Sequence, residues 1–181
     1  PGSDIDDEAY RRGTSVYLVD HVDPMLPEEL CNFLCSLRPN EEKLCMSVIF
    51  SMTPEGEVKK AKLCRTVICS NARLNYDEAE QIIEGKAEKE YAPALVEAIL
   101  TLNDVAKCLR RKRFAEGSLY LEQDEMHFRL DEEGEPIDIY FEKPNDAHHL
   151  IEEFMLLANR TVATMVGKKP FVYRIHDKPD K

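Results

Sequence analysis

The amino-acid sequence predicts an α+β fold, in which a mixed, largely antiparallel sheet packs with helices. Short segments of alternating apolar residues predict half-buried strands, and longer segments with apolar residues three and four apart predict amphipathic helices. These segments do not follow the regular strand–helix–strand order of a parallel sheet. With 181 residues, of which 43% are hydrophobic, the chain can bury a core, so we expect one domain over residues 1–181.

Turn residues and the alternation of apolar and polar side chains predict a helix and two strands in the first half of the chain. A short helix from Asp4 to about Arg12 is expected, because acidic residues in a first turn complement the helix dipole. Residues 44–52 place an apolar side chain at every second position, which predicts a half-buried strand. The segment Thr-Pro-Glu-Gly at residues 53–56 then turns the chain into a partner strand that runs through about Cys69.

Three helices are expected further along the chain. The first covers Tyr76–Glu84 and closes at Gly85, since glycine readily adopts the left-handed conformation that ends a helix. A longer helix ends at Gly117, and the last covers about Asn145–Val166 and stops at Gly167. The apolar face of the longer helix consists of Leu95, Ala98, Ile99, Leu102, Val105, Ala106 and Leu109.

Short strands are expected between and after the last two helices. Residues 119–121, 126–130 and 137–141 alternate between apolar and polar side chains. Asp131–Gly134 is a plausible hairpin turn between the last two of these segments. A final short strand is predicted at Phe171–Ile175.

Charge and hydropathy exclude some classes of protein. The net charge of −11 argues against a nucleic-acid surface spread over the whole chain, although a local basic groove stays open. The sequence contains no apolar stretch of the length that crosses a membrane, so we expect no membrane partner.

Six cysteines lie mostly within apolar patterns, which favours reduced, buried thiols and a cytoplasmic protein. A zinc protein that uses Cys31 and Cys35 is a further alternative, but a second pair of ligands with zinc spacing is missing.

Four motifs occur in a fixed order along the chain. They are Arg-Gly-Thr-Ser-Val-Tyr-Leu at residues 12–18, Pro-Met-Leu-Pro at 24–27, Leu-Cys-Ser-Leu-Arg-Pro at 34–39 and Leu-Ile-Glu-Glu-Phe-Met-Leu-Leu-Ala-Asn-Arg at 150–160. Together they resemble the catalytic (RNB) domain of the ribonuclease II/R family, whose members shorten RNA from its 3′ end. The resemblance covers the full chain, and within the family the bacterial ribonuclease R branch looks most similar.

The resemblance implies that the chain is the central part of an RNB domain. A parent protein would then hydrolyse single-stranded RNA processively to nucleoside 5′-monophosphates with Mg²⁺, and would carry flanking cold-shock and S1 RNA-binding domains. The family's catalytic Asp-x-Asp-Asp cluster is expected before Pro1, and its Thr-Ser-Pro-hydrophobic-Arg motif after this chain. We therefore expect no catalytic residue, no metal ligand and no nuclease activity in the isolated chain. The alternative is an RNA-binding relative that has lost its catalytic carboxylates.

Three residues are the predicted RNA contacts. Tyr17 and Tyr120 match the two aromatic positions that clamp the terminal bases in the family, and Glu152 matches its substrate-contacting glutamate. The pattern of the last helix also separates two neighbouring carboxylates. Glu152 borders the apolar arc of that helix, whereas Glu153 lies nearly opposite the arc and is expected to be solvated.

Two charged clusters have simpler interpretations. Asp4, Asp6 and Asp7 could hold magnesium through carboxylate oxygens, but they match the family segment that lies after the catalytic aspartates. We interpret them as the acidic start of a helix. The basic run at residues 110–113 could contact phosphates, but such a run more often completes and solvates the end of a helix. Arg38 and Arg174 lie in family-like motifs without an assigned role.

Overall fold

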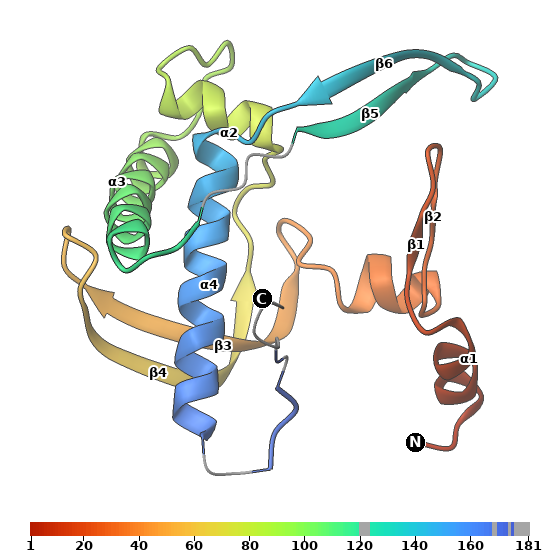
Figure 1. Cartoon of the computed structure of the whole chain (residues 1–181), viewed down its shortest axis with the longest axis horizontal. Helices are drawn as coiled ribbons and strands as arrows, with labels where there is room; N and C mark the ends of the chain where they lie inside the picture. The colour runs from red at the N-terminus through yellow and green to blue at the C-terminus, as the bar shows by residue number, and fades with distance from the viewer. Residues whose placement is uncertain (120–123, 168–169, 174, 176–181) are drawn as a thin grey trace, which may run out of the picture. The chain divides into compact units, whose positions relative to one another are not determined.

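The computed structural model describes residues 1–119, 124–167, 170–173 and 175, and confirms an α+β fold of helices and antiparallel strand pairs (Figure 1). The chain divides into two compact units. Unit 1 comprises Pro1–Cys45, Thr66–Asn75 and Tyr120–Pro144, and unit 2 comprises Met46–Arg65, Tyr76–Leu119 and Asn145–Lys181. That residues 1–181 fold as a single domain stays a prediction.

Unit 1 begins with the expected helix, α1 (Asp4–Arg12). The hydroxyl of Ser3 accepts a hydrogen bond from the backbone N–H of Asp6 (3.3 Å), which satisfies one of the free donors at the helix start. The helix ends at Gly13, whose φ of 72° belongs to the left-handed region that favours glycine. The Arg12 guanidinium donates to Asp23 (2.7 Å) and so ties the helix end to β2.

Unit 1 also contains two short hairpins and a turn of π-helix. Strands β1 (Val16–Tyr17) and β2 (Val22–Asp23) pair antiparallel, and the π-helix covers Glu29–Leu34. Strands β5 (Glu125–Leu130) and β6 (Pro136–Glu142) also pair antiparallel. The turn between them is closed by Asp131, whose carboxylate accepts the backbone N–H groups of Glu133 and Glu135. The predicted hairpin is confirmed.

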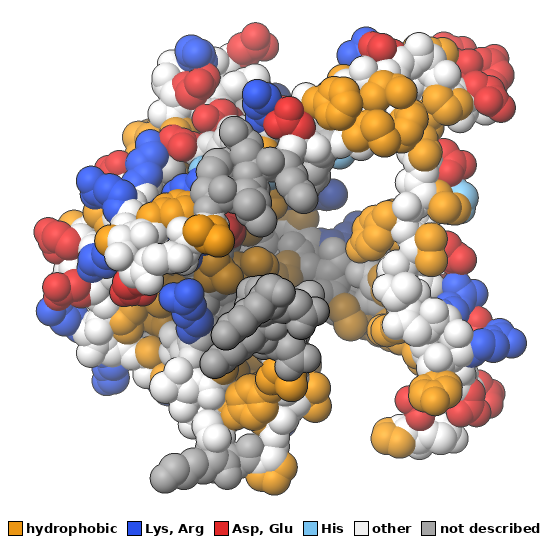
Figure 2. Space-filling model, viewed as in Figure 1, with side chains coloured by type: hydrophobic (Ala, Val, Ile, Leu, Met, Phe, Trp, Pro, Cys, Tyr) orange, Lys and Arg blue, Asp and Glu red, His pale blue; other side chains and the backbone are white. Residues whose placement is uncertain are grey.

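The β5–β6 hairpin carries an exposed apolar face. Met126 lies opposite Phe141, and Phe128 lies opposite Ile139, so these side chains share one face of the two-stranded ribbon. Met126, Ile139 and Phe141 are all exposed. Figure 2 shows the hydrophobic side chains gathered over this hairpin.

Strands β3 (Glu42–Met52) and β4 (Val58–Cys69) form the long predicted hairpin and contribute residues to both units. Val48, Phe50 and Met52 are half-buried, as the alternation predicts. The prediction is wrong for the first residues of the same face, since Leu44 is 88% exposed and Met46 is also exposed. Alternation predicts which side chains share a face of the strand, but it does not supply a packing partner along the whole length of that face.

Unit 2 is a cluster of three helices that pack against one another: α2 (Tyr76–Ile83), α3 (Pro93–Ala115) and α4 (Asp146–Val166) (Figure 1). All three were expected, and their predicted ends at Gly85, Gly117 and Gly167 are confirmed to within two residues. Among the described residues, the buried apolar side chains come from these helices: Ile82, Val105, Ala106 and Ala147.

The start of α4 is fixed by side chains from two helices. Asn145 accepts the backbone N–H of His148 (3.1 Å), and the His148 ring accepts the N–H of Asn145, which completes a capping box. Glu80 of α2 accepts the N–H of Ala147 (2.9 Å). The ring of Tyr76 stacks on His148 with centroids 3.8 Å apart. These contacts hold the first turn of α4 against α2.

Two strand predictions are not supported in the described part of the chain. Phe171–Tyr173 and Ile175 are not in a strand, because apolar alternation over five residues does not by itself supply a pairing partner. Leu119 also lies outside any strand, and residues 120–123 lie outside the described residues.

Gly56, in the β3–β4 turn, generates a stability prediction. It has a φ of 75°, and a Cβ there would lie 3.3 Å from Leu109 Cδ2 of α3. Gly56→Ala should lower the free energy of unfolding by roughly 2 kcal/mol, because backbone strain and crowding add. Gly85→Ala is the matched control, since Gly85 has a φ of 69° and open space around it. Equal losses in urea denaturation would show that the Leu109 contact contributes nothing.

Candidate functional site

The predicted contact Glu152 lies on α4, where its carboxylate faces cations from α3. Arg113 donates to it (3.0 Å), Arg110 lies 3.5 Å from it, and His149 lies one turn earlier at 3.9 Å. The Glu152 side chain is 40% exposed. The carboxylate is therefore held from one side by guanidinium groups while its other side stays accessible to a ligand.

Glu153 has a different environment from the one expected. The sequence places it on the solvated face of the helix, but it is only 3% exposed, so this prediction is wrong. The physical reason is Arg113, which donates from Nε to both oxygens of Glu153 (3.0 and 3.3 Å) and again from a terminal nitrogen (2.5 Å). A buried carboxylate is tolerated when it is paired and hydrogen-bonded in this way. The spacing of apolar residues along α4 also predicts that Ile151 and Met155 are buried, but both are exposed.

Arg113 thus bridges two consecutive carboxylates of α4. The hydrogen bonds with Glu153, followed by the nearby charges of both glutamates, raise the pKa of Arg113 above its ordinary value. The planar guanidinium presents several donors in a fixed fork, which a lysine ammonium would not reproduce. Glu152 and Glu153 are therefore oriented by one cation that lies 40 residues earlier in the sequence than Glu153.

The basic run at residues 110–113 is only partly the solvated helix end that the sequence predicts. Arg111 and Lys112 are exposed, as expected. Arg110 and Arg113 turn toward α4 and pair with its carboxylates. The sequence alone did not predict this pairing, although Arg113 follows Leu109 by four residues and so shares its helix face.

His149 lies at the edge of this charge cluster. Burial and, next, the positive charge of Arg110 lower the pKa of His149 below its ordinary value. The imidazole is therefore neutral at neutral pH and can donate or accept a hydrogen bond.

Tyr17, the other described contact predicted from the sequence, lies on β1 opposite Val22 and is 80% exposed. An aromatic ring this exposed is available for stacking on a base. Tyr17 belongs to unit 1 and Glu152 to unit 2. The third predicted contact, Tyr120, lies outside the described residues.

The acidic cluster at the start of the chain is the first turn of α1. Asp4, Asp6 and Asp7 all lie in that turn, which agrees with the helix-start interpretation. Asp6 accepts the backbone N–H of Gly2 (2.8 Å). Over the described ranges, no three or more His, Cys, Asp or Glu side chains are grouped to hold a metal ion. The six cysteines are free thiols, but the prediction that they are buried is wrong, since Cys35 and Cys69 are exposed and the other four are only half-buried. Of the helices that the structure describes, none has the length and apolar character needed to span a membrane.

Comparison with known proteins identifies the family to which the chain belongs. The family model described as the RNB domain matches residues 1–181, and the chain belongs to this family. Among curated relatives, ribonuclease R of Aquifex aeolicus is 41% identical over 99% of this chain, which corresponds to 26% of that protein. DIS3-like exonuclease 2 of Schizosaccharomyces pombe is 45% identical over 93% of this chain and 19% of its own length. The chain thus spans about a fifth to a quarter of these relatives.

Solved structures agree with the family and the fold. Mycoplasma genitalium RNase R in complex with double-stranded RNA superposes with a TM-score of 0.85 at 32% identity, over 92% of this chain and 30% of that chain. The same enzyme in complex with ribose methylated single-stranded RNA gives a TM-score of 0.84 at 31% identity, over 92% of this chain and 26% of that chain. The resemblance to the ribonuclease R branch, first indicated by the motifs, is confirmed.

Arg113 generates a second stability prediction. Arg113→Ala should lower the free energy of unfolding by about 3–5 kcal/mol, because it leaves the carboxylate of Glu153 buried without a partner. Arg111→Ala is the matched control: it removes the same kind of side chain from an exposed position two residues earlier and should change stability by less than about 0.5 kcal/mol. Urea denaturation of both variants measures the difference, and a similar small loss in both would contradict the assignment.

His149 generates a prediction on pH. Because its pKa is lowered in the folded chain, the unfolded chain binds more protons as the pH falls below about 6.5. Stability should therefore decrease from pH 6.5 toward pH 5, and His149→Gln should flatten this dependence. Unfolding measured across that range tests the sign. A slope that His149→Gln leaves unchanged would assign the dependence to other groups.

Proposed function

We propose that this chain is the central part of the RNB domain of a 3′-to-5′ exoribonuclease. Membership of the RNB family, together with relatives named ribonuclease R and DIS3-like exonuclease 2, is the observation that carries the proposal. The parent protein would hydrolyse single-stranded RNA processively to nucleoside 5′-monophosphates in the cytoplasm. Cold-shock and S1 domains of the parent would supply the positive surface that this acidic chain lacks.

The side chains of this piece would grip the RNA end rather than cleave it. Tyr17, on its exposed strand, would stack on a base without regard to its identity, and Tyr120 would provide the second aromatic face. Glu152 would accept hydrogen bonds from sugar hydroxyls, since an ionised carboxylate only accepts. The guanidinium of Arg113 would hold that carboxylate in a fixed orientation before RNA binds.

The chemistry of cleavage would depend on Mg²⁺ held elsewhere in the parent. Bound magnesium would activate a water and stabilise the leaving oxygen. Asp4, Asp6 and Asp7 do not fit as its ligands, because they are spread around a capped helical turn and Asp6 already binds the backbone of Gly2. No catalytic step is therefore assigned to residues of this chain.

An RNA-binding relative without catalysis is the second candidate. The fold is shared by yeast Ssd1, a pseudonuclease, at a TM-score of 0.66 and 18% identity, so the fold alone does not establish activity. The residues encoded before Pro1 discriminate between the two. An intact Asp-x-Asp-Asp motif favours the nuclease, and its substitution favours the binding protein.

An RNA-decay assay tests the proposal. The parent protein with magnesium should shorten a 5′-labelled single-stranded oligonucleotide stepwise and release nucleoside monophosphates, whereas chain 1–181 should not. Tyr17→Ala should raise the KM of the parent about tenfold, because one stacked base is worth roughly 1–3 kcal/mol. Tyr10→Ala is the matched control, since Tyr10 is 91% exposed on α1 and has no predicted contact. Cleavage by chain 1–181 itself, abolished by Asp6→Asn, would overturn the assignment of the metal site.

A further inference from the structure

The β1–β2 hairpin that carries Tyr17 is too short to hold itself in place. Its strands, Val16–Tyr17 and Val22–Asp23, are exposed along their whole length, so burial contributes little to the hairpin. One further backbone hydrogen bond, from the N–H of Leu18 to the carbonyl of His21 (2.9 Å), closes the turn. An isolated two-stranded hairpin is at best marginally stable in water. Contacts from outside the hairpin must therefore fix its orientation.

The guanidinium of Arg12 supplies such contacts. Its Nη1 donates to the carboxylate of Asp23 (2.7 Å) and to the backbone carbonyl of Pro24 (3.0 Å). Its Nε donates to the carboxylate of Glu8, one turn earlier in α1 (2.7 Å). These three contacts are called the Arg12 anchor. Figure 1 shows the hairpin rising from the end of α1, so one planar group joins the helix to the base of the hairpin.

The Arg12 anchor acts next to Tyr17 in the register of the hairpin. Asp23 pairs with Val16, so the anchored residue lies directly opposite the neighbour of Tyr17. A second tie at the base comes from Ser15, whose hydroxyl accepts the N–H of Met25 (3.0 Å). The Tyr17 side chain is 80% exposed and receives little support from packing. Its orientation therefore depends on the backbone that these two ties hold.

The neighbouring Arg11 shows that the anchor is specific to Arg12. Both arginines lie in the last turn of α1, where positive charge complements the helix dipole, and both pair with Glu8. Arg11 is 77% exposed, and within the described part of the chain Glu8 is its only ion-pair partner. The hydrogen bond with Glu8, followed by that with Asp23, raises the pKa of Arg12 above its ordinary value. Arg12 alone of the two reaches the hairpin.

We propose that Arg12 is a positioning residue for Tyr17: it ties β2 to α1 and so holds the hairpin in the orientation in which the Tyr17 ring meets a base. The inference rests on the proposed RNA contact of Tyr17. Arg12 does not bind RNA itself, but it reduces the freedom that the ring would lose on binding. The motif at residues 12–18 thus contains the anchor at its start and the stacking ring near its end.

Hydrogen exchange of the RNA-free parent protein tests the anchor itself. Arg12→Gln should speed the exchange of amide hydrogens in residues 16–23 about tenfold, because the hairpin opens locally more often. Arg11→Gln is the matched control: it removes the same charge from the same helical turn and leaves the contacts with β2 in place. It should leave the exchange within about twofold. Equal exchange rates in the two variants would contradict the anchor.

Equilibrium binding of a short oligouridylate to the parent protein, without magnesium, tests the consequence for Tyr17. Tyr17→Ala should weaken binding about tenfold, and Arg12→Gln about threefold, because a ring that is not held loses part of its stacking. When Tyr17 is already alanine, Arg12→Gln should cause no further loss. If the two losses multiply instead, Arg12 acts independently of Tyr17 and the proposal fails.

Asp23→Ala separates positioning from a direct contact of Arg12 with a phosphate. It breaks the anchor from the other side, so binding should again weaken about threefold, and only when Tyr17 is present. If Arg12 bound a phosphate directly, removal of this neighbouring negative charge would leave the affinity unchanged or raise it, which would overturn the proposal. Thermal unfolding verifies that each variant is folded.

The same titrations separate a failure of this inference from a failure of the proposed function. If Tyr17→Ala does not weaken binding, the proposed RNA contact of Tyr17 is wrong, and the positioning role of Arg12 is wrong with it. If Tyr17→Ala weakens binding and Arg12→Gln does not, only the positioning role is refuted.

Discussion

The interaction between Arg113 and two consecutive glutamates of α4 is the constraint on which unit 2 depends. Glu153 is buried at the contact of α3 with α4, and a carboxylate there is stable only if a cation and hydrogen bonds replace its water. Arg113 supplies both and reaches Glu152 with the same guanidinium. One buried ion pair thus fixes how the two helices meet and where the exposed carboxylate points.

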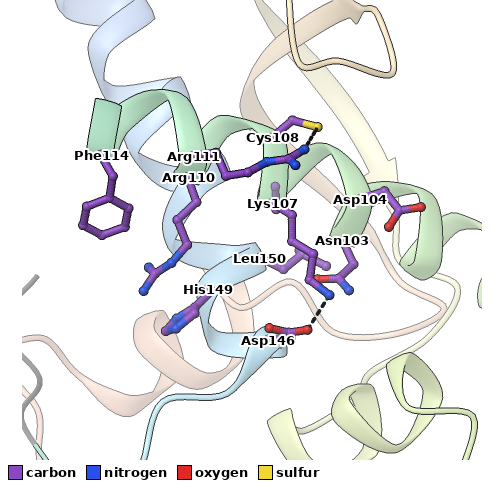
Figure 3. A pocket seen from close by; sticks show the side chains of 11 residues that line it. Asn103, Asp104, Lys107, Cys108, Arg110, Arg111, Phe114, Asp146, His149 and Leu150 are labelled. Carbon is purple, nitrogen blue, oxygen red and sulfur yellow. Dashed lines mark hydrogen bonds and ion pairs between the residues drawn. The ribbon is translucent and has the colours of Figure 1, made fainter. Parts of the chain in front are cut away.

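This arrangement separates a structural carboxylate, Glu153, from the proposed RNA contact, Glu152, in the adjacent position. Glu153 is almost completely buried, whereas Glu152 keeps part of its side chain in solvent with cations behind it. A ligand at Glu152 would meet a carboxylate that Arg113 already orients, so little freedom is lost on binding. The same helix pair lines an adjacent cavity, which Arg110 also borders (Figure 3).

The sequence predicts those elements whose signals are local. Ser3 and Gly13 bound α1, and Asn145 begins α4, because a cap or a left-handed glycine acts within a few residues. The burial of Glu153 could not be predicted in the same way, since its partner Arg113 belongs to another helix. The burial of Asn103 was predictable only in part. It lies four residues after Ile99 and three before Ala106, which is the helical register of a buried position. Its polar side chain nevertheless argued for an exposed position.

The function is likewise predictable only in part. The motif around Tyr17 indicates the family, and the family model confirms that membership. The role of the exposed Tyr17 ring cannot be predicted from the chain alone, because it depends on the RNA that would stack on it. The net charge of −11 argued against nucleic-acid binding, but a net charge does not show how the positive and negative groups are distributed over the surface. The paired arginines of α3 show how positive groups are concentrated locally within an acidic chain.

A double-mutant cycle between Arg113 and Glu153 tests the central claim most directly. The free energies of unfolding of the Arg113→Met, Glu153→Gln and doubly substituted chains would be compared with that of the original chain. If the pair is coupled as the hydrogen bonds indicate, the double variant should lose at least about 1 kcal/mol less than the sum of the single losses. Losses that add within about 0.3–0.5 kcal/mol would contradict the account, because independent residues behave in that way.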